Sequence, residues 1–132
     1  MTPFALPLSA MMRGMLDAAI HEHPTASAII LSFRDPSYSP EQGGYHPVEI
    51  RLEHRQACWQ LAYITDFAYF GPPGFAELEK DVDFDFNAGV GFLPWLGERP
   101  LADFTDLYLC WEENFLTYCQ REVYQLNVTT EK

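Results

Sequence analysis

The stretch SFRDPSYSPEQGGYHPVEIRL, residues 32–52, organises this chain, because apolar runs flank a loop dense in proline, glycine, serine and ring-bearing side chains. After the loop, Val48, Ile50 and Leu52 alternate with charged residues, the pattern of a strand with one dry face. The stretch therefore predicts a hairpin that sets the register of a sheet. Because the loop also carries Arg34 and His46, it is a candidate for a functional site.

Charge is distributed unevenly along the chain. The 132 residues contain 8 Lys+Arg and 19 Asp+Glu, a formal net charge of −11 at pH 7, and residues 71–113 hold ten of the acids but only two bases. Such a surface repels phosphate backbones and anionic membranes, so direct binding to either is disfavoured, whereas a basic protein would be attracted. The same charge would keep a domain with 15% aromatic residues soluble, and the sequence leaves both roles open.

Length and composition predict a single globular domain, residues 1–132, with 48% hydrophobic residues. We expect neither a signal peptide nor a membrane span, because no basic region precedes an apolar stretch and no apolar run approaches about eighteen residues. The cysteines Cys58, Cys110 and Cys119 lack metal or redox spacing, so they are interpreted as reduced, buried thiols of a cytoplasmic protein. Residues 1–7 form an apolar leader that docks on this domain or on a neighbour's, and either a monomer or a homodimer is compatible with the sequence.

Two helices are predicted from capping residues and apolar spacing. The first begins at Ser9, which can cap it, and ends at Pro24. The second begins at Pro100 and carries an apolar stripe, with acids such as Glu112 off the stripe. The stripe consists of Phe104, Leu107, Tyr108, Trp111, Phe115 and Tyr118.

Five strands are predicted, at residues 26–33, 48–53, 58–65, 82–86 and 124–128. The first is apolar at consecutive positions, so we expect both of its faces to be covered and the strand to be central. The remaining segments are interpreted as a helical turn (75–80), irregular backbone (88–91), a loop that covers one end of the core (92–97) and a frayed tail (130–132).

The order helix, four strands, helix, strand predicts an α+β protein. Short links between successive strands imply antiparallel pairing. Two helices on one face of such a sheet make a two-layer sandwich, here with a mostly antiparallel sheet of about five strands.

Four segments of the chain resemble a known family. They are FRDPSYS (33–39), GGYHPVEIRL (43–52), YITDF (63–67) and DFDF (83–86). Together they are similar to the uncharacterised bacterial proteins called domain of unknown function 2787, and the similarity extends over about residues 27–128. The resemblance implies a bacterial source, and it implies no activity, cofactor or catalytic residue.

No metal or cofactor is predicted. The acids of residues 81–87 invite a calcium interpretation, but a calcium loop needs Gly at its sixth position and Glu at its twelfth, and neither Asp81 nor Asp83 as first position satisfies this. On a strand these carboxylates would line one solvated face. His21 and His23 lack the spacing that puts two imidazoles on one helical face.

Two functions remain open. The first, which we favour, is a non-enzymatic interaction module that binds another macromolecule, above all a protein, through rings such as Phe92 and Trp95 beside the acidic stretch. Mimicry of nucleic acid by ordered carboxylates is a special case of it. The second is a small polar-ligand binder or enzyme with a site at the loop of residues 34–46, next to Asp66. Its candidate residues are Arg34, Asp35, Tyr38, Tyr45, His46 and Asp66.

A structural interpretation of the same loop residues competes with the second function. In it, Asp35 caps its own turn, Arg34 pairs with an acid, and the tyrosines pack. A pocket that gathers at least three of Arg34, Asp35, Tyr38, His46 and Asp66 would favour the ligand site. Dispersal of these side chains, together with an exposed patch at residues 92–96, would favour the interaction module.

Overall fold

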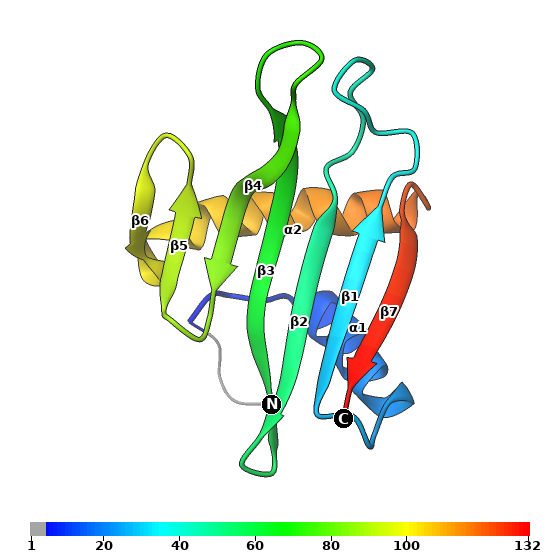
Figure 1. Ribbon diagram of the computed structural model, residues 1–132. Coiled ribbons are helices and arrows are strands. Elements are labelled where there is room, and N and C mark those ends of the chain that lie inside the picture. Colours follow the sequence, from blue (N-terminus) through cyan, green and yellow to red (C-terminus); the bar gives the residue numbers. More distant parts are fainter. Residues whose placement is uncertain (1–4) are drawn as a thin grey trace.

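The computed structural model describes residues 5–132, which form seven strands, two α-helices and one 3-10 helix (Figure 1). In chain order these are α1 (Ala10–Glu22), β1 (Ala28–Arg34), β2 (Val48–Arg55), β3 (Cys58–Phe70), β4 (Glu77–Asp85), β5 (Val90–Leu93), β6 (Gly97–Pro100), η1 (Leu101–Phe104), α2 (Thr105–Gln120) and β7 (Gln125–Glu131). Residues 1–4 of the apolar leader lie outside the described residues. Leu6 of the leader is buried in this chain's own core, so the described part of the leader docks on its own domain.

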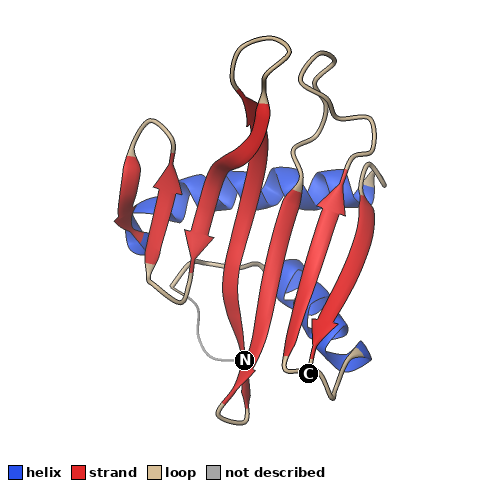
Figure 2. Ribbon diagram, in the orientation of Figure 1, coloured by secondary structure: helices blue, strands red, loops and turns tan. Residues whose placement is uncertain are grey.

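All seven strands form one antiparallel sheet in the order β6-β5-β4-β3-β2-β1-β7, and both helices lie against the same face of it (Figure 2). The prediction of an α+β protein with an antiparallel sheet is confirmed. The predictions of about five strands and of four strands between the helices are wrong, because six strands precede α2. β1, which was expected to be central, lies one strand from the edge, between β2 and β7.

The two strands that the sequence analysis missed are β5 and β6, at residues interpreted there as irregular backbone and a loop. Gly91 pairs with Phe84 of β4 and with Arg99 of β6, so it lies inside a strand. A Cβ atom at Gly91 would lie 2.4 Å from Cδ2 of Phe104, which packs over the strand at this point. Glycine is therefore required here for the close packing of η1 and not for an irregular backbone. The loop expected at residues 92–97 is only a turn at residues 94–96 between β5 and β6.

The part of the β3–β4 hairpin next to its turn also differs from the prediction. β3 continues without a break to Phe70, and its last residues need a partner strand. Glu77–Lys80 supplies that partner, where a helical turn had been expected. The expectation that residues 130–132 fray is also wrong, because the last strand extends to Glu131: Thr130 pairs with Ile29 and Glu131 pairs with Ala28.

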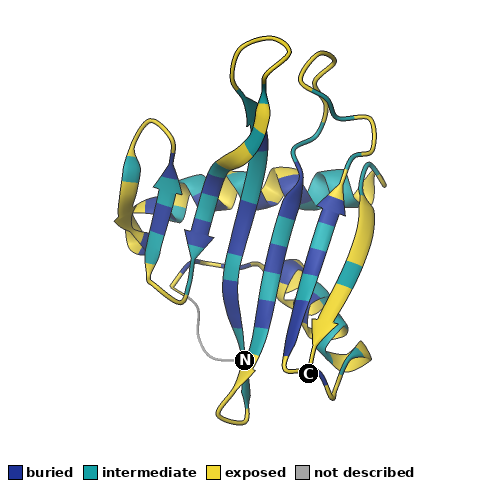
Figure 3. Cartoon of the chain, in the orientation of Figure 1, coloured by how far each residue is buried: buried dark blue, intermediate teal, exposed yellow. Residues whose placement is uncertain are grey.

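The core lies between the sheet and the helices, where buried residues gather on the middle strands (Figure 3). Val48, Ile50 and Leu52 are all buried, as the alternation predicted. Ser9 caps α1 by accepting a hydrogen bond from the Met12 amide at 3.1 Å, which confirms the predicted start. Neither helix of residues 5–132 is long and apolar enough to cross a membrane.

The second helix begins as a 3-10 turn and becomes α-helical at Thr105. Phe104, Tyr108 and Phe115 of the predicted stripe are buried. Glu112, expected to lie off the stripe, is only 4% exposed. Its carboxylate accepts from the Ser9 amide, with Oε1 and Oε2 at 3.1 and 3.3 Å. A buried carboxylate is acceptable here because it receives a backbone donor at the start of α1, where the helix dipole favours negative charge.

The three cysteines are free thiols. Cys58 and Cys119 are partly buried, and burial raises the pKa of Cys119 to about 11. Cys110 is exposed on α2, which corrects the expectation that it is buried.

Candidate functional site

The loop between β1 and β2 is held by Asp35. One carboxylate oxygen accepts from the amide and hydroxyl of Ser37 at 2.9 and 2.6 Å, and the other accepts from the amide of Tyr45 at 3.0 Å. These hydrogen bonds, the Ser37 hydroxyl foremost, hold the pKa of Asp35 below its usual range. The interpretation that Asp35 caps its own turn is thus confirmed, and the turn fixes the backbone immediately before His46.

Gly44 makes this closed loop possible. Its φ is +136°, and a Cβ atom would lie 2.8 Å from Oδ2 of Asp35 and 3.1 Å from Cα of Tyr38. Gly43 has a positive φ as well, but nothing lies within 4 Å of the position of its Cβ. The pair of glycines therefore serves turn geometry, and only Gly44 also serves packing.

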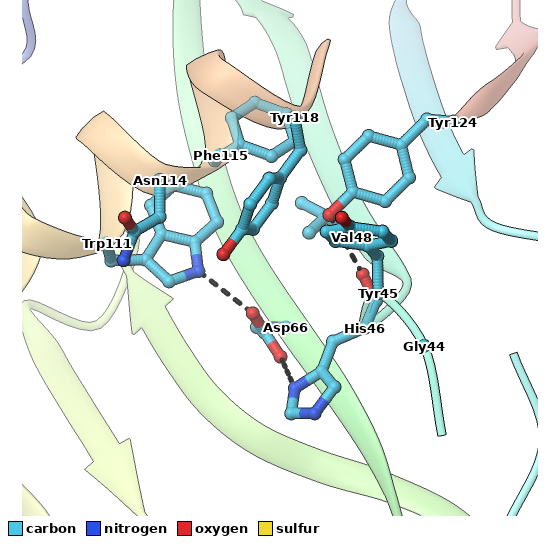
Figure 4. Close-up of a pocket in the computed structure, with 10 residues that line it drawn as sticks. All are labelled: Gly44, Tyr45, His46, Val48, Asp66, Trp111, Asn114, Phe115, Tyr118 and Tyr124. Atoms are coloured by element: carbon cyan, nitrogen blue, oxygen red, sulfur yellow. Dashed lines mark hydrogen bonds and ion pairs between the residues drawn. The ribbon is translucent and has the colours of Figure 1, made fainter. Parts of the chain in front are cut away.

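His46 and Asp66 meet, with Nδ1 of the imidazole 2.8 Å from Oδ1 of the carboxylate (Figure 4). Asp66 faces the helices, since β3 pairs it with the buried Val48 of β2. Its second oxygen accepts from Nε1 of Trp111 on α2 at 2.9 Å. The hydrogen bond that the His46 imidazole donates to Asp66 is the main cause that raises the pKa of His46, with burial acting against it.

A β-bulge brings a second carboxylate to the same imidazole. Asp66 pairs with Val82 and the next residue, Phe67, pairs with Lys80, so Asp81 has no partner of its own on β3. Oδ2 of Asp81 lies 3.5 Å from Nδ1 of His46. Burial, and then the charge of Asp66, raise the pKa of Asp81, while His46 lowers it.

The bulge separates Asp81 from Asp83 and Asp85. Asp83 accepts a hydrogen bond from the Thr65 hydroxyl at 2.7 Å and lies near Lys80, and Asp85 borders the same shallow pocket. Asp83 and Asp85 thus share one face of the strand, as predicted. The expectation that Asp81 lines that face with them is wrong, because the extra residue of a bulge breaks the alternation of side chains.

A pocket of about 240 Å³ opens between α2 and the end of the β1–β2 loop (Figure 4). Its walls are largely aromatic, and Asp66, His46 and Asn114 line it beside the phenol groups of Tyr45, Tyr118 and Tyr124. The Tyr118 side chain reaches from α2 toward Asp66 (Figure 4), and its ring lies 4.6 Å from that of Tyr45. The lining residues are Gly44, Tyr45, His46, Val48, Asp66, Trp111, Asn114, Phe115, Tyr118 and Tyr124.

The predicted ligand-binding residues are only partly brought together. Tyr45, His46 and Asp66 line the pocket, whereas Asp35 serves the turn. Tyr38 packs beside His46, with ring centroids 5.6 Å apart, and its hydroxyl accepts from the Tyr69 amide at 3.1 Å. Two of the five side chains named as a criterion therefore share the pocket, short of the three that would favour a ligand site.

Arg34 points away from this cluster. Its side chain is exposed, and Nε donates to the hydroxyl of Ser32 at 3.4 Å. Among residues 5–132, Arg34 forms no ion pair, so the expectation that it pairs with an acid is not met.

Sequence reasoning missed the contribution of α2 to the pocket and that of β4 to the cluster at His46. Trp111 and Tyr118 were assigned to the core stripe, and helical spacing alone cannot show that a ring at the margin of a stripe borders a cavity. Tyr124 donates its hydroxyl to the carbonyl of His46 at 3.2 Å, across 78 residues of sequence. No local signal predicts such a contact.

Of the two residues predicted for an interaction surface, one is strongly exposed. Trp95, in the β5–β6 turn, is 80% exposed, and its neighbour Leu96 is also exposed. Phe92 is only partly exposed, opposite Asp83. Phe75, in the β3–β4 turn, is 78% exposed and was not predicted. The β1–β2, β3–β4 and β5–β6 loops all stand at the same end of the sheet (Figure 1), which we call the loop end.

The fold and the site define an α+β protein in which a seven-stranded antiparallel sheet carries two helices on one face. The chain belongs to the family described as "Protein of unknown function (DUF2787)", whose model matches residues 7–129. The match confirms the resemblance noted in the sequence. A search of curated proteins finds no match.

Two solved structures from Vibrio cholerae are similar over nearly the whole chain. The hypothetical protein VC0508 of the VSP-II pathogenicity island is 37% identical, with a TM-score of 0.85 over 97% of this chain and 98% of its own. The conserved hypothetical protein VC1805 of pathogenicity island VPI-2 is 40% identical, with the same TM-score and coverage. VC1805 is described as sharing structural homology with the human P32 protein.

Proposed function

We propose that this protein is a non-enzymatic interaction module of the bacterial cytoplasm that binds another protein through its loop end. The single observation that carries the proposal is Trp95, whose indole is 80% exposed at the tip of a short hairpin. Large aromatic side chains are enriched where proteins contact one another, and they supply most of the energy in such contacts. Phe75 offers a second exposed ring at the same end of the sheet.

The turn that carries Trp95 is held in place by the pairing of its two flanking strands. β5 is paired with β4 through Asp83↔Phe92 and with β6 through Leu93↔Gly97, and Leu93 is buried. The backbone of a short turn between paired strands is already ordered, so it loses little conformational entropy when the turn is bound. Residues of loops on a rigid scaffold are common contact points for the same reason.

Charge indicates the kind of partner. With a net charge of −11, two copies of this chain repel each other, which disfavours a homodimer relative to a complex with a basic protein. The proposed partner therefore presents an apolar pocket for the indole, surrounded by Lys or Arg. Added salt should slow its association more than its dissociation, because electrostatic attraction mainly acts on the encounter.

Photo-crosslinking in the bacterium that encodes the protein tests this proposal. A benzophenone amino acid replaces Trp95 in one variant and Leu109 in another, since Leu109 is an exposed apolar residue of α2. The proposal predicts one discrete adduct from position 95 and none from position 109. Equal adducts from both positions, or none from position 95, would contradict it.

A second candidate function, binding of a small polar ligand in the pocket beside α2, is favoured by a separate observation. The Asp66 carboxylate is fixed between His46 and Trp111 at the edge of an aromatic cavity of about 240 Å³. Pockets that combine aromatic walls with a few convergent polar groups are typical binding sites. A fragment screen by NMR would show shifts of the Trp111 indole proton in the wild type that are lost in Tyr118→Ala.

A further inference from the structure

Three donor atoms from separate segments converge beside the pocket. Nδ1 of His46, a carboxylate oxygen of Asp66 and one of Asp81 all lie within 4.8 Å of one another. They come from the β1–β2 loop, β3 and β4. Nδ1 lies 2.8 Å from Asp66 and 3.5 Å from Asp81, and a single ring nitrogen carries at most one proton. Nδ1 therefore has at most one proton to share between the two carboxylates.

We propose that His46, Asp66 and Asp81 bind a transition-metal dication of the Zn²⁺ type. Ligand atoms bound to Zn²⁺ at tetrahedral or octahedral angles lie about 2.8 to 3.6 Å apart, given metal–ligand bonds of about 2.0 to 2.2 Å. The distances of 2.8 and 3.5 Å from Nδ1 to the two carboxylates lie within this range. Only small side-chain movements would be needed to admit the ion.

The donor set selects the class of metal. One imidazole nitrogen and two carboxylate oxygens suit Zn²⁺ and its first-row neighbours, while Ca²⁺ prefers six to eight oxygens. The three residues leave further coordination positions to water or to a ligand. Since the three segments are far apart in sequence, the cluster has no metal-binding spacing that sequence analysis could detect.

Neighbouring groups hold the donors in place. Nε1 of Trp111 binds one oxygen of Asp66 at 2.9 Å and leaves the other directed at His46. The Tyr38 ring packs against the imidazole, and the Tyr124 hydroxyl binds the His46 carbonyl. Groups that orient metal ligands in this way are part of most protein metal sites.

The β-bulge is a separate observation that points to this site. Without it, Asp81 would share a face with Asp83 and Asp85, away from the imidazole. With it, the Asp81 carboxylate is 32% exposed and stands beside that of Asp66, which is 13% exposed, so two like charges are held close together. Bulges that turn a side chain are common beside functional sites. A dication would offset the repulsion between the two carboxylates.

Calorimetric titration of the full chain with ZnCl₂, after treatment with a chelator, tests the site. The wild type should bind one equivalent of Zn²⁺. Asp81→Asn and His46→Gln should each bind it at least about tenfold more weakly, as changes around a metal typically do. The matched controls are His54→Gln, which alters an exposed histidine of β2, and Cys110→Ser, which alters the exposed thiol, and both should bind like the wild type.

Three results would overturn the proposal: no Zn²⁺ binding by the wild type, equal binding by Asp81→Asn and the wild type, or equal affinities for Ca²⁺ and Zn²⁺. If the variants do not fold, the absorption spectrum of the Co²⁺-loaded wild type decides the matter. Ligand-field bands without thiolate charge transfer support the assigned donors, and a thiolate band, or no spectrum at all, overturns them. The metal-site proposal is independent of the proposed contact surface at the loop end. Crosslinking at Trp95 requires no metal, so either proposal can fail without the other.

Discussion

The β1–β2 loop and the β5–β6 turn stand at the same end of the sheet, yet they relate to the core in opposite ways. In the loop, Asp35 accepts hydrogen bonds from the Ser37 and Tyr45 amides, and His46 pairs with Asp66 of the sheet. The β5–β6 turn leaves Trp95 exposed. The loop residues thus build and support a local cluster, whereas the turn carries a large ring that is not packed in the core. An apolar ring without a role in folding is available for a partner.

Gly44→Ala should give the largest effect on the loop side of this comparison. The change forces a side chain into a positive φ and against Asp35, which should lower the free energy of unfolding by about 2–4 kcal/mol. Gly43→Ala, with open space around its Cβ, should cost only about 1 kcal/mol. Urea denaturation of both variants measures the difference. Equal costs would mean that the closed loop does not depend on the contact with Asp35.

Asp66→Ala should cause the next largest loss in the free energy of unfolding, measured in chelator-treated protein. It removes the acceptor of the Trp111 indole and of His46, and a partly buried donor left without its partner costs about 1–3 kcal/mol. The Trp111 indole proton should also exchange faster with solvent in the variant, which NMR can follow. If stability and exchange are both unchanged, the hydrogen bond between Trp111 and Asp66 does not contribute to stability.

Asp35→Ala should have a smaller effect that depends on pH. Loss of the turn contacts should cost about 1 kcal/mol at neutral pH. The folded-state pKa of Asp35 lies below the ordinary value of 3.8, so its stabilisation is present above that value and is lost as the pH falls through the lowered pKa. Thermal unfolding of the two proteins should therefore converge in acid. A gap that widens with acidification would contradict the assigned hydrogen bonds.

Trp95→Ala should have the smallest effect on folding. Its side chain is almost fully exposed, so the free energy of unfolding should change by no more than about 0.5 kcal/mol. Leu93→Ala, in the same hairpin, is the contrast, because Leu93 is buried and its truncation should cost about 2–4 kcal/mol. A large loss of stability in Trp95→Ala would mean that the Trp95 ring contributes to folding, as the residues of the β1–β2 loop do, and would contradict its availability for a partner.

How far sequence predicts this molecule depends on whether the signal is local. The alternation at Val48–Leu52, the cap at Ser9 and the turn at Asp35 are local, and they were predicted. The strand at Gly91 was missed because the glycine is required by a distant residue, Phe104 of η1, which packs directly on it. Glycine in isolation looks like a break in structure.

The candidate site divides in the same way. His46 and Asp66 were named from the sequence, but whether they meet is set by the pairing of β2 with β3. Sequence alone could not place Asp81 beside His46 and Asp66, since only the bulge in the pairing of β3 with β4 turns Asp81 toward the imidazole. Trp111 showed helical spacing, which predicts burial and says nothing of the carboxylate that its indole binds.

The most direct test of the proposed contact surface is the affinity of Trp95→Ala for the protein that photo-crosslinking at position 95 captures. We expect its dissociation constant to rise at least about tenfold, equivalent to about 1.4 kcal/mol, while the unfolding midpoint stays at the wild-type value. Gly43→Ala in the β1–β2 loop should bind like the wild type. An unchanged dissociation constant for Trp95→Ala would contradict the claim that the β5–β6 turn is the contact surface.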